Sequence, residues 1–290
     1  MSQRRVLVTG TSGNIGSELL PMLLANSDLE VTACYRKAEQ REQFLAAGAN
    51  TVMLDMDCRE TIGPALKNID SLFLLKPYTI KMLIQGKVLL DAAKAAGVKH
   101  IVHLGAHGAD DTPWAIIGWH HMVERYIEAL GFEWTHLRPN FFMENLLKGC
   151  NRETAEVYHY LDDDRTVSWV SCREIAQTAA SALANPAQYA GSTLHLASDK
   201  KSLQEIAALI SANSGRQYHY KQLPRDVGFK AMTRLGREAE FVDPWLDYMV
   251  AINAGDVAEI DQCFRHSGIG SAGDDNSLDT FLQQHAKVFN

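Results

Sequence analysis

The sequence predicts an α/β fold in which a doubly wound parallel sheet is joined to a smaller α/β C-terminal lobe. Two observations carry this prediction. Strand-favouring segments alternate with segments of helical periodicity through the first half of the chain. A strand, a turn with three glycines and a helix also follow one another within residues 4–20. We place the sheet domain at residues 1–150, and at residues 151–290 a smaller lobe that packs on it and covers the substrate.

Composition indicates an ordinary globular protein of 290 residues, with 46% hydrophobic and 22% charged side chains. The formal net charge is −7 and Lys and Arg form no run, so nucleic-acid binding is disfavoured. No apolar run approaches the ~20 residues of a membrane span and no signal peptide is visible. We therefore expect a cytoplasmic protein that does not bind membranes. The five cysteines are scattered, which predicts free thiols and neither disulfides nor zinc.

The first strand, Val6–Thr9, runs into a glycine-rich turn and then a Leu-rich helix. Gly10 permits the tight turn, Gly13 allows a diphosphate to approach the backbone, and Gly16 allows the helix to pack on the strand. The helix amides then face the phosphates. This pattern predicts a Rossmann-type dinucleotide site, the alternative being a turn that binds nothing. The predicted cofactor-binding residues here are Gly10, Thr11, Ser12, Gly13, Asn14, Ile15 and Gly16.

Pro21 fits this helix badly, because proline should kink a helix or remove a backbone hydrogen bond.

The residues after the second strand, Glu30–Tyr35, indicate which dinucleotide is bound. An NAD site usually has an acid there for the ribose 2′-hydroxyl, whereas a 2′-phosphate favours a cation. This chain has Arg36 and Lys37. Arginine can bind a phosphate with two parallel hydrogen bonds, so we assign Arg36 to the 2′-phosphate and Lys37 as an auxiliary. NADP(H) is therefore predicted to be preferred over NAD(H), unless the two cations are only a solvated pair.

The third and fourth strands end in further candidate cofactor contacts. Asp55 can accept from the adenine amino group and Met56 can cover the ring, although Asp55 or Asp57 can alternatively cap the next helix. The apolar run at residues 69–77 is typical of a central buried strand. Its last residues, Leu75 and Lys76, are expected beside the cofactor.

The remaining segments continue the alternation. We predict a helix at residues 80–96, a strand at 98–108, a helix at 112–131 and a strand from 132 to Leu137, broken by Pro139. In the second half we predict a helix from residue 171 or 172 to 185, a strand at 191–198, a helix at 202–214, a strand at 217–224, and helices after Val242 interrupted by a flexible loop at 268–277. Ser202 and Glu205 have the spacing of a capping box, and Gly215 follows the same helix as a stop.

Four segments of the chain together resemble the NmrA-like family of atypical short-chain dehydrogenase/reductases: VTGTSGNIG, GVKHIVHLGAHGA, WHHMVERYIEALG and LRPNFFMENLL. The resemblance is specific over the first half, and EIAALISANSGRQYHY is similar to the family's small C-terminal lobe. It implies an NADPH-dependent reductase of quinones, azo dyes or triarylmethane dyes. The family also contains regulators that bind a dinucleotide without turnover, which is the alternative function.

The wider superfamily uses a Tyr-x-x-x-Lys pair on the helix after the fifth strand, with a serine at that strand's end. Here Ile116 and His120 occupy the Tyr and Lys positions, and the serine position falls in residues 105–107. Alcohol oxidation by a tyrosinate is therefore disfavoured, whereas hydride transfer to an electrophilic conjugated atom needs mainly positioning.

His120 is the candidate catalytic residue, either bracing the nicotinamide ribose or donating a proton. Glu124, one turn later, could hold its ring and favour the imidazolium. The alternative is that both form a structural pair. His121 should point elsewhere. A metal cluster of His103, His107 and His120 has no supporting ligand pattern, so no metal is predicted.

Aromatic and apolar residues at the strand ends suggest a pocket for a flat aromatic or quinone-like substrate, although the residues after the sixth strand could instead belong to the core. The predicted pocket residues are Tyr78, His107, Asn140, Phe142 and Met143. A homo-oligomer or a regulatory protein partner is compatible with the sequence.

Overall fold

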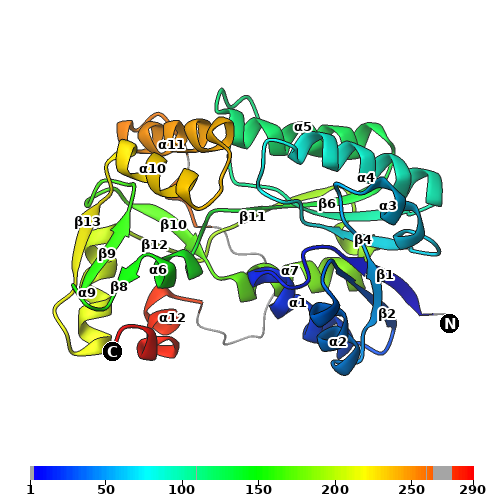
Figure 1. The fold of residues 1–290 in the computed structure, drawn as a ribbon, viewed down its shortest axis with the longest axis horizontal. Helices are drawn as coiled ribbons and strands as arrows, with labels where there is room; N and C mark the ends of the chain where they lie inside the picture. The colour runs from blue at the N-terminus through cyan, green and yellow to red at the C-terminus, as the bar shows by residue number, and fades with distance from the viewer. Residues whose placement is uncertain (1–2, 109, 259, 264–275) are drawn as a thin grey trace.

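The computed structural model describes residues 3–108, 110–258, 260–263 and 276–290, and its centre is a parallel sheet flanked by helices on both faces (Figure 1). The strand order is β11-β6-β5-β4-β1-β2-β3, and every neighbouring pair is parallel. The strands are β1 (Arg4–Val8), β2 (Leu29–Tyr35), β3 (Asn50–Met53), β4 (Ser71–Leu74), β5 (His100–Leu104), β6 (Glu133–Pro139) and β11 (Ser192–Leu196). The predicted Rossmann-like, doubly wound fold is confirmed.

Helices α1, α2 and α7 cover one face of the sheet, and α3, α4 and α5 cover the other (Figure 1). These helices are α1 (Asn14–Leu24), α2 (Ala38–Ala46), α3 (Arg59–Ala65), α4 (Met82–Ala96), α5 (Ala115–Ala129) and α7 (Cys172–Ala184), and a short α8 (Pro186–Tyr189) follows α7. Strands β4 and β5 are buried throughout, because helices cover both of their faces.

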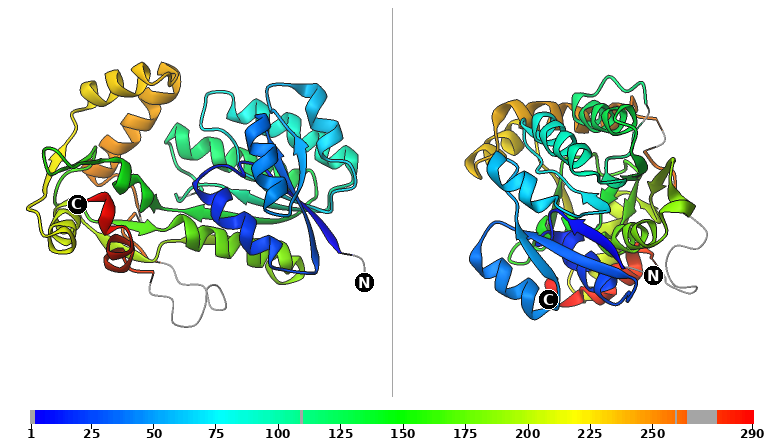
Figure 2. Two further views of the ribbon diagram at one scale, coloured as in Figure 1. Left: turned by 60° about the horizontal axis from the view of Figure 1, so that its bottom comes forward. Right: turned by 90° about the vertical axis from the view of Figure 1, so that its right-hand side faces the viewer.

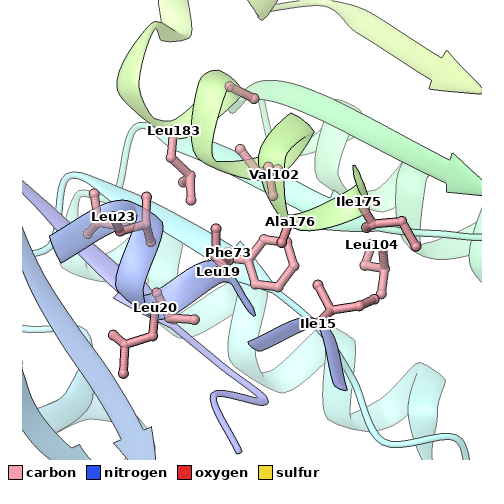
Figure 3. Packing of buried hydrophobic residues seen from close by; sticks show 14 of the residues in the cluster. Ile15, Leu19, Leu20, Leu23, Phe73, Val102, Leu104, Ile175, Ala176 and Leu183 are labelled. Carbon is pink, nitrogen blue, oxygen red and sulfur yellow. The ribbon is translucent and has the colours of Figure 1, made fainter. Parts of the chain in front are cut away.

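Alternate residues of each strand enter opposite cores. In β1, Leu7 joins the core under α3, α4 and α5, whereas Val6 and Val8 join the core under α1 and α7. Figure 3 shows the second core, in which Phe73 of β4 lies among side chains of α1 and α7 such as Leu19 and Ala176.

Helix α1 continues through Pro21 to Leu24. Pro21 has no backbone N–H, so the carbonyl of Ser17, four residues earlier, loses the hydrogen bond that it would otherwise accept within the helix. Both residues are exposed, so solvent can hydrate that carbonyl.

The smaller lobe lies beyond the carboxyl ends of the sheet strands (Figures 1 and 2). It contains two three-stranded sheets, in the orders β12-β10-β7 and β13-β9-β8. Their strands are β7 (Phe141–Phe142), β8 (Cys150–Asn151), β9 (Glu156–His159), β10 (Val167–Val170), β12 (Asp199–Lys201) and β13 (His219–Gln222). The lobe's helices are α6 (Glu144–Lys148), α9 (Leu203–Ser214), α10 (Arg225–Arg234), α11 (Ala239–Ala254), α12 (Leu278–Gln284) and the 3-10 turn η1 (Ala286–Val288). Its core includes Trp169, and Ile116 and Ile117 of α5 pack into it, so the lobe is joined directly to the sheet domain.

The sequence suggested that the chain divides between the two parts at residue 150. The structure shows no single point of division. Strand β7 already pairs with β10 in a sheet of the lobe, and β11 returns to the central sheet beside β6. Helix α7, which also follows residue 150, packs on α1 and so belongs to the sheet domain. The lobe is therefore built from several separate segments, which alternation of elements along the sequence does not reveal.

Local signals in the second half match the structure. Ser202 and Glu205 form the predicted capping box of α9, and Gly215 ends that helix with a φ of +69°. Helix α11 begins at Ala239, slightly before the predicted Val242, and α10 was not predicted. The loop predicted at 268–277 lies almost entirely outside the described residues. Within the described ranges, no helix combines the length and apolarity needed to cross a bilayer.

Candidate functional site

The glycine turn has the compact geometry that the sequence predicts. Gly10 has a φ of +66°, and the Gly13 amide donates to the Gly10 carbonyl at 2.9 Å. A Cβ on Gly16 would lie 2.2 Å from that same carbonyl oxygen, so only glycine fits there. Gly13 is the N-cap of α1 and no side chain caps the helix. The first amides of α1 are therefore open to an anionic ligand, as a bound diphosphate requires.

Thr9, which the sequence analysis did not single out, fixes the loop after β4 against this turn. Its hydroxyl accepts from the Leu75 amide at 2.8 Å and lies 2.9 Å from the carbonyl oxygens of Phe73 and Leu75. A Cβ on Gly10 would lie 2.9 Å from a methyl group of Leu75. The hydrogen bonds of Thr9 explain how Leu75 and Lys76 are held beside the turn. A threonine directly before the first glycine is the sequence feature that could have indicated this contact.

Gln40 of α2 connects the glycine turn to the predicted 2′-phosphate residues. Its side-chain oxygen accepts from the backbone amides of Arg36 and Lys37, at 3.0 and 3.1 Å, and its side-chain nitrogen donates to the Ser12 hydroxyl at 2.9 Å. Arg36 and Lys37 are exposed at the start of α2. Thr11 is buried and donates to the Val8 carbonyl, so it shapes the turn from within.

Asp55 and Met56 lie in the turn after β3, and neither Asp55 nor Asp57 caps α3. The N-cap of α3 is Cys58, which has no side-chain cap. The Asp55 carboxylate instead accepts from the Asp57 amide at 3.0 Å. Asp57 accepts from Gln85, which lowers the pKa of its carboxyl, with the charges of Lys81 and Arg36 adding to the effect. The alternative, in which one of these aspartates caps the next helix, is therefore wrong, whereas the adenine contact of Asp55 stays a prediction.

A cavity of about 1570 Å³ extends from the glycine turn across the ends of β4, β5 and β6 into the smaller lobe. Many residues predicted from sequence line it. They are Gly13, Asn14, Ile15, Leu75, Lys76, Tyr78, His107, His120, Asn140 and Phe142. Predicted residues that do not line it are Gly10, Thr11, Ser12, Gly16, Arg36, Lys37, Asp55, Met56 and Met143. Met143 is fully buried in the core of the lobe, so its assignment to the pocket was wrong.

The lobe contributes residues to the cavity that sequence reasoning missed. Phe241, Trp245 and Tyr248 of α11 line it, together with Tyr158 and Tyr160 around the end of β9. The ring of Tyr78 packs edge-on against Phe241, with centroids 5.3 Å apart. The sequence of α11 contains no motif that indicates a binding site, because its aromatic residues have the spacing of ordinary core positions in a helix.

His120 is buried at the cavity wall and hydrogen-bonds with Tyr78. Its Nε2 atom lies 3.0 Å from the Tyr78 hydroxyl, and its Nδ1 has no hydrogen-bond partner among the described residues. Burial holds the pKa of His120 well below its ordinary value, with the charges of Lys76 and His121 acting in the same direction. The imidazole is therefore neutral near pH 7. His121 does not line this cavity but a separate hollow beside Asp110 and Arg125, which agrees with the prediction that it points away from His120.

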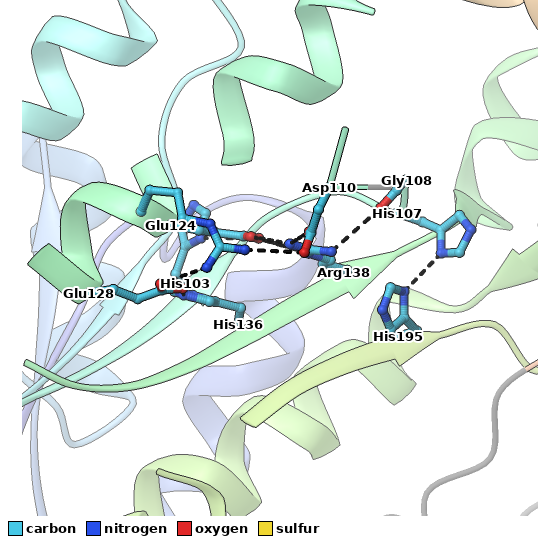
Figure 4. A network of polar contacts seen from close by, with 10 residues as sticks. His103, His107, Gly108, Asp110, Glu124, Glu128, His136, Arg138 and His195 are labelled. Carbon is cyan, nitrogen blue, oxygen red and sulfur yellow. Dashed lines mark hydrogen bonds and ion pairs between the residues drawn. The ribbon is translucent and has the colours of Figure 1, made fainter. Parts of the chain in front are cut away.

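Glu124 does not hold the His120 ring, which corrects the expectation of a His120–Glu124 pair. Its carboxylate accepts from Arg138 of β6, with a shortest distance of 2.6 Å, and Arg138 also donates to Asp110 (Figure 4). The Glu124 side chain is fully buried. A Cβ on Gly105 would lie 2.7 Å from its carboxylate, so a side chain there would push the carboxylate out of its present position beside Arg138.

The three histidines that the sequence considered together do not form one cluster, although the rings of His103 and His120 lie 6.1 Å apart between centroids. His107 pairs with His195 at 3.1 Å between Nδ1 atoms (Figure 4), whereas His103 contacts Lys76. His103, Glu124 and His136 do place potential ligand atoms within 4.8 Å of one another. The Glu124 carboxylate already forms an ion pair with Arg138, and the positive charge of this arginine would repel a metal cation placed beside it. The absence of a metal stays a prediction.

Lys76 enters the cavity wall at the end of β4. It is 5% exposed, and its Nζ lies 2.5 Å from Nε2 of His103. Burial lowers the pKa of the Lys76 amine to about 7, and the charge of Glu124 opposes this effect only in part.

Comparison with known proteins agrees with this geometry. Residues 2–264 match the model of the NmrA-like family. An NAD(P)H azoreductase of Xenophilus azovorans is 33% identical over 241 residues, which cover 82% of this chain and 84% of that protein. Quinone oxidoreductase 2 of Escherichia coli (strain K12) is 24% identical, covering 86% and 88%. The structure of Citrobacter sp. triphenylmethane reductase complexed with NADP(H) superposes with a TM-score of 0.73 at 19% identity, covering 90% and 96% of the two chains.

Proposed function

Because this chain belongs to the NmrA-like family, we propose that it is an NADPH-dependent oxidoreductase that transfers a hydride to a small conjugated acceptor. Quinones, azo compounds and triarylmethane dyes are the proposed acceptor classes. The class of enzyme is supported by the relative at 33% identity, which is named an NAD(P)H azoreductase.

The single observation that carries the proposal is the continuous cavity between the glycine turn and the aromatic side chains of the lobe. A dinucleotide with its diphosphate at Gly13 and Asn14 would extend along the ends of β4 and β5 toward His120. When bound, NADPH would supply the hydride. The rings of Tyr78, Phe241 and Trp245 offer flat apolar surfaces for a conjugated acceptor, which suits such a compound better than a sugar.

His120 is proposed to position the cofactor ribose. Its neutral ring is fixed by the hydrogen bond between Nε2 and the Tyr78 hydroxyl, so a ribose placed against this wall would meet an uncharged ring in one orientation. This role agrees with Ile116 at the position where the superfamily has its catalytic tyrosine, because an isoleucine supplies no acid.

The preference for NADP(H) is proposed from Arg36 and Gln40. Gln40 holds the backbone of Arg36 and the hydroxyl of Ser12, so a phosphate placed between the turn and α2 would meet a cation. We also propose a cytoplasmic location, because the cysteines of the chain are free thiols, as is usual in a reducing compartment.

A spectrophotometric assay of NADPH oxidation tests the function. The wild-type protein is incubated with NADPH and, in separate reactions, a benzoquinone, an azo dye and a cationic triarylmethane dye. We expect oxidation that depends on at least one acceptor and is lost in Gly13→Val, whose branched side chain would occupy the diphosphate position. Tight NADPH binding by calorimetry without turnover of any acceptor would favour the other function in the family, a dinucleotide-sensing regulator with a protein partner. The observation that favours this alternative is Ile116, which stands where the superfamily has its catalytic tyrosine.

A further inference from the structure

We propose that Lys76 is a catalytic residue that donates a proton to the acceptor after hydride transfer. The inference rests on the proposed function and makes it more specific. It predicts that the enzyme distinguishes acceptors that need a proton, such as quinones and azo compounds, from cationic dyes that need none.

The position of Lys76 supports this role. It lines the same cavity as Gly13, Tyr78 and His120, at the end of a central strand where ligands of such sheets bind. Thr9 fixes the neighbouring Leu75, and a Cβ on Gly86 would lie 3.1 Å from Cδ of the lysine, so α4 holds the lysine stem closely. The lysine stem that carries the amine is therefore held in place at the cavity wall.

The amine has a hydrogen-bond partner but no counterion of its own. Its Nζ lies 2.5 Å from His103 Nε2, and no carboxylate among the described residues forms an ion pair with it. The nearest acid, Glu124, is already bound by Arg138. An ammonium ion that is buried without a paired carboxylate holds its proton weakly, which agrees with its pKa of about 7.

The other titratable groups around Lys76 are less suited to the task. Burial raises the pKa of Tyr78 to about 12, so its hydroxyl is a weak acid. Burial holds the pKa values of His120 and His103 well below the ordinary value, so both are neutral at pH 7. His136, further along the buried network, has its pKa lowered to about 3 by burial. Burial also raises the pKa of Glu124, but its carboxylate is bound by Arg138 and does not line the cavity. A general acid works best when its pKa is near the working pH, which among these groups favours Lys76.

The proposed step balances in atoms and electrons. NADPH is oxidised to NADP⁺ as a quinone or azo acceptor gains a hydride, which leaves a negative charge on an oxygen or nitrogen of the acceptor. That atom takes a proton from Lys76: the lysine N–H bond breaks, an O–H or N–H bond forms, and a neutral amine remains. The amine then regains a proton from water. A triarylmethane cation becomes neutral when it accepts the hydride, so it needs no proton.

Lys76→Met and Lys76→Arg test the role by comparison of acceptors. Methionine removes the amine at similar size, and arginine keeps a charge whose proton is not released. With saturating quinone or azo dye we expect kcat to fall about a hundredfold or more in both variants. With the cationic dye, which needs no proton transfer, we expect the fall in kcat of both variants to be at least about tenfold smaller than with the quinone or azo dye. Lys67→Met, at an exposed lysine outside the cavity, is the matched control.

Equal losses with all acceptors, or no loss with any, would overturn the role of Lys76 while leaving the proposed function in place. No NADPH oxidation by wild type with any acceptor would overturn the proposed function and this step with it.

A second measurement does not depend on activity. The protein without cofactor is prepared with ¹³C-labelled lysine, and the Lys76 side-chain signal is assigned by its absence from the Lys76→Met spectrum. We expect this signal to titrate with a midpoint near pH 7. A midpoint near the ordinary lysine value of ~10.4 would overturn the proposal, even if Lys76→Met proved inactive for another reason.

Discussion

At the scale of single residues, a few side chains determine which dinucleotide the cleft is expected to prefer. Gln40 bonds to Ser12 in the glycine turn and to the backbone of Arg36, so it fixes the distance between the turn and α2. The Arg36 side chain is exposed and near Asp57, so it can reorient toward a phosphate.

Arg36→Ala should therefore weaken NADPH binding and leave NADH binding nearly unchanged. Loss of a charged hydrogen bond should cost about 1.5 to 3 kcal/mol, or roughly tenfold to 150-fold in Kd. Calorimetry with both dinucleotides measures this, and Arg41→Ala, an exposed arginine further along α2, is the control. Equal affinities of the wild-type protein for NADPH and NADH would contradict the assignment.

His120 should behave as a positioning residue. Since its ring is neutral and hydrogen-bonded with Tyr78, His120→Ala should raise the Kd for NADPH and leave kcat largely intact. The pH profile of kcat should also be the same in wild type and variant, because burial keeps the His120 pKa below the working range. A variant that is about a hundredfold slower and has lost a wild-type pH dependence would show instead that His120 is the acid.

At the scale of elements, the glycines between β1 and α1 serve two different purposes: Gly16 is needed for packing of the fold, and Gly13 is proposed to leave room for the ligand. Gly16 is required by packing, because a Cβ would collide with the Gly10 carbonyl oxygen at 2.2 Å. Gly13 has an ordinary φ of −82°, and its Cβ would lie 3.2 Å from that oxygen. The fold therefore tolerates a small side chain at Gly13 better than at Gly16.

We expect Gly16→Ala to be strongly destabilised, by an amount on the order of 3 kcal/mol or more, or not to fold. Gly13→Ala should fold with a Tm close to wild type and bind NADPH more weakly. Thermal unfolding and calorimetry on both variants separate the two roles. Normal NADPH binding by folded Gly13→Ala would argue against a diphosphate at this turn.

Individual elements could be predicted in both parts of the molecule because they carry local signals: a buried apolar run in β4 and a glycine after α4 in the sheet domain, and a capping box in α9 of the lobe. Their grouping in space could not. Strand β11 joins the central sheet beside β6, and no local pattern distinguishes it from a strand of the lobe. The same limit applies to the site, because Tyr78 and His120 are 42 residues apart and their hydrogen bond depends on the tertiary fold.

At the scale of the whole molecule, a buried charged network connects β5 and β6 with α5 (Figure 4). Glu124 and Arg138 form its buried ion pair, and removal of one partner leaves an unpaired charge. Arg138→Met should therefore lower the free energy of unfolding by about 3 to 5 kcal/mol. Urea unfolding measures this, with Arg125→Met, at an exposed arginine of α5, as control. A loss below about 1 kcal/mol would mean that Glu124 is neutral in the fold.

The second whole-molecule consequence is a pH dependence of stability that originates at Lys76. Its pKa is about 7 in the folded protein and ~10.4 in an unfolded chain, so between these values the unfolded chain binds a proton that the folded protein does not. Stability from this group therefore rises with pH across that window.

Lys76→Met should be more stable than wild type at pH 6.5, and this advantage should shrink by about 3 kcal/mol as the pH rises to about 9.5. Urea unfolding of both proteins at several pH values measures the difference, in which titrations common to both cancel. Lys67→Met should instead follow the wild-type curve at every pH. If the curves of wild type and Lys76→Met run parallel, Lys76 keeps its proton in the folded protein, and the weakly held proton that we assign to the cavity wall does not exist.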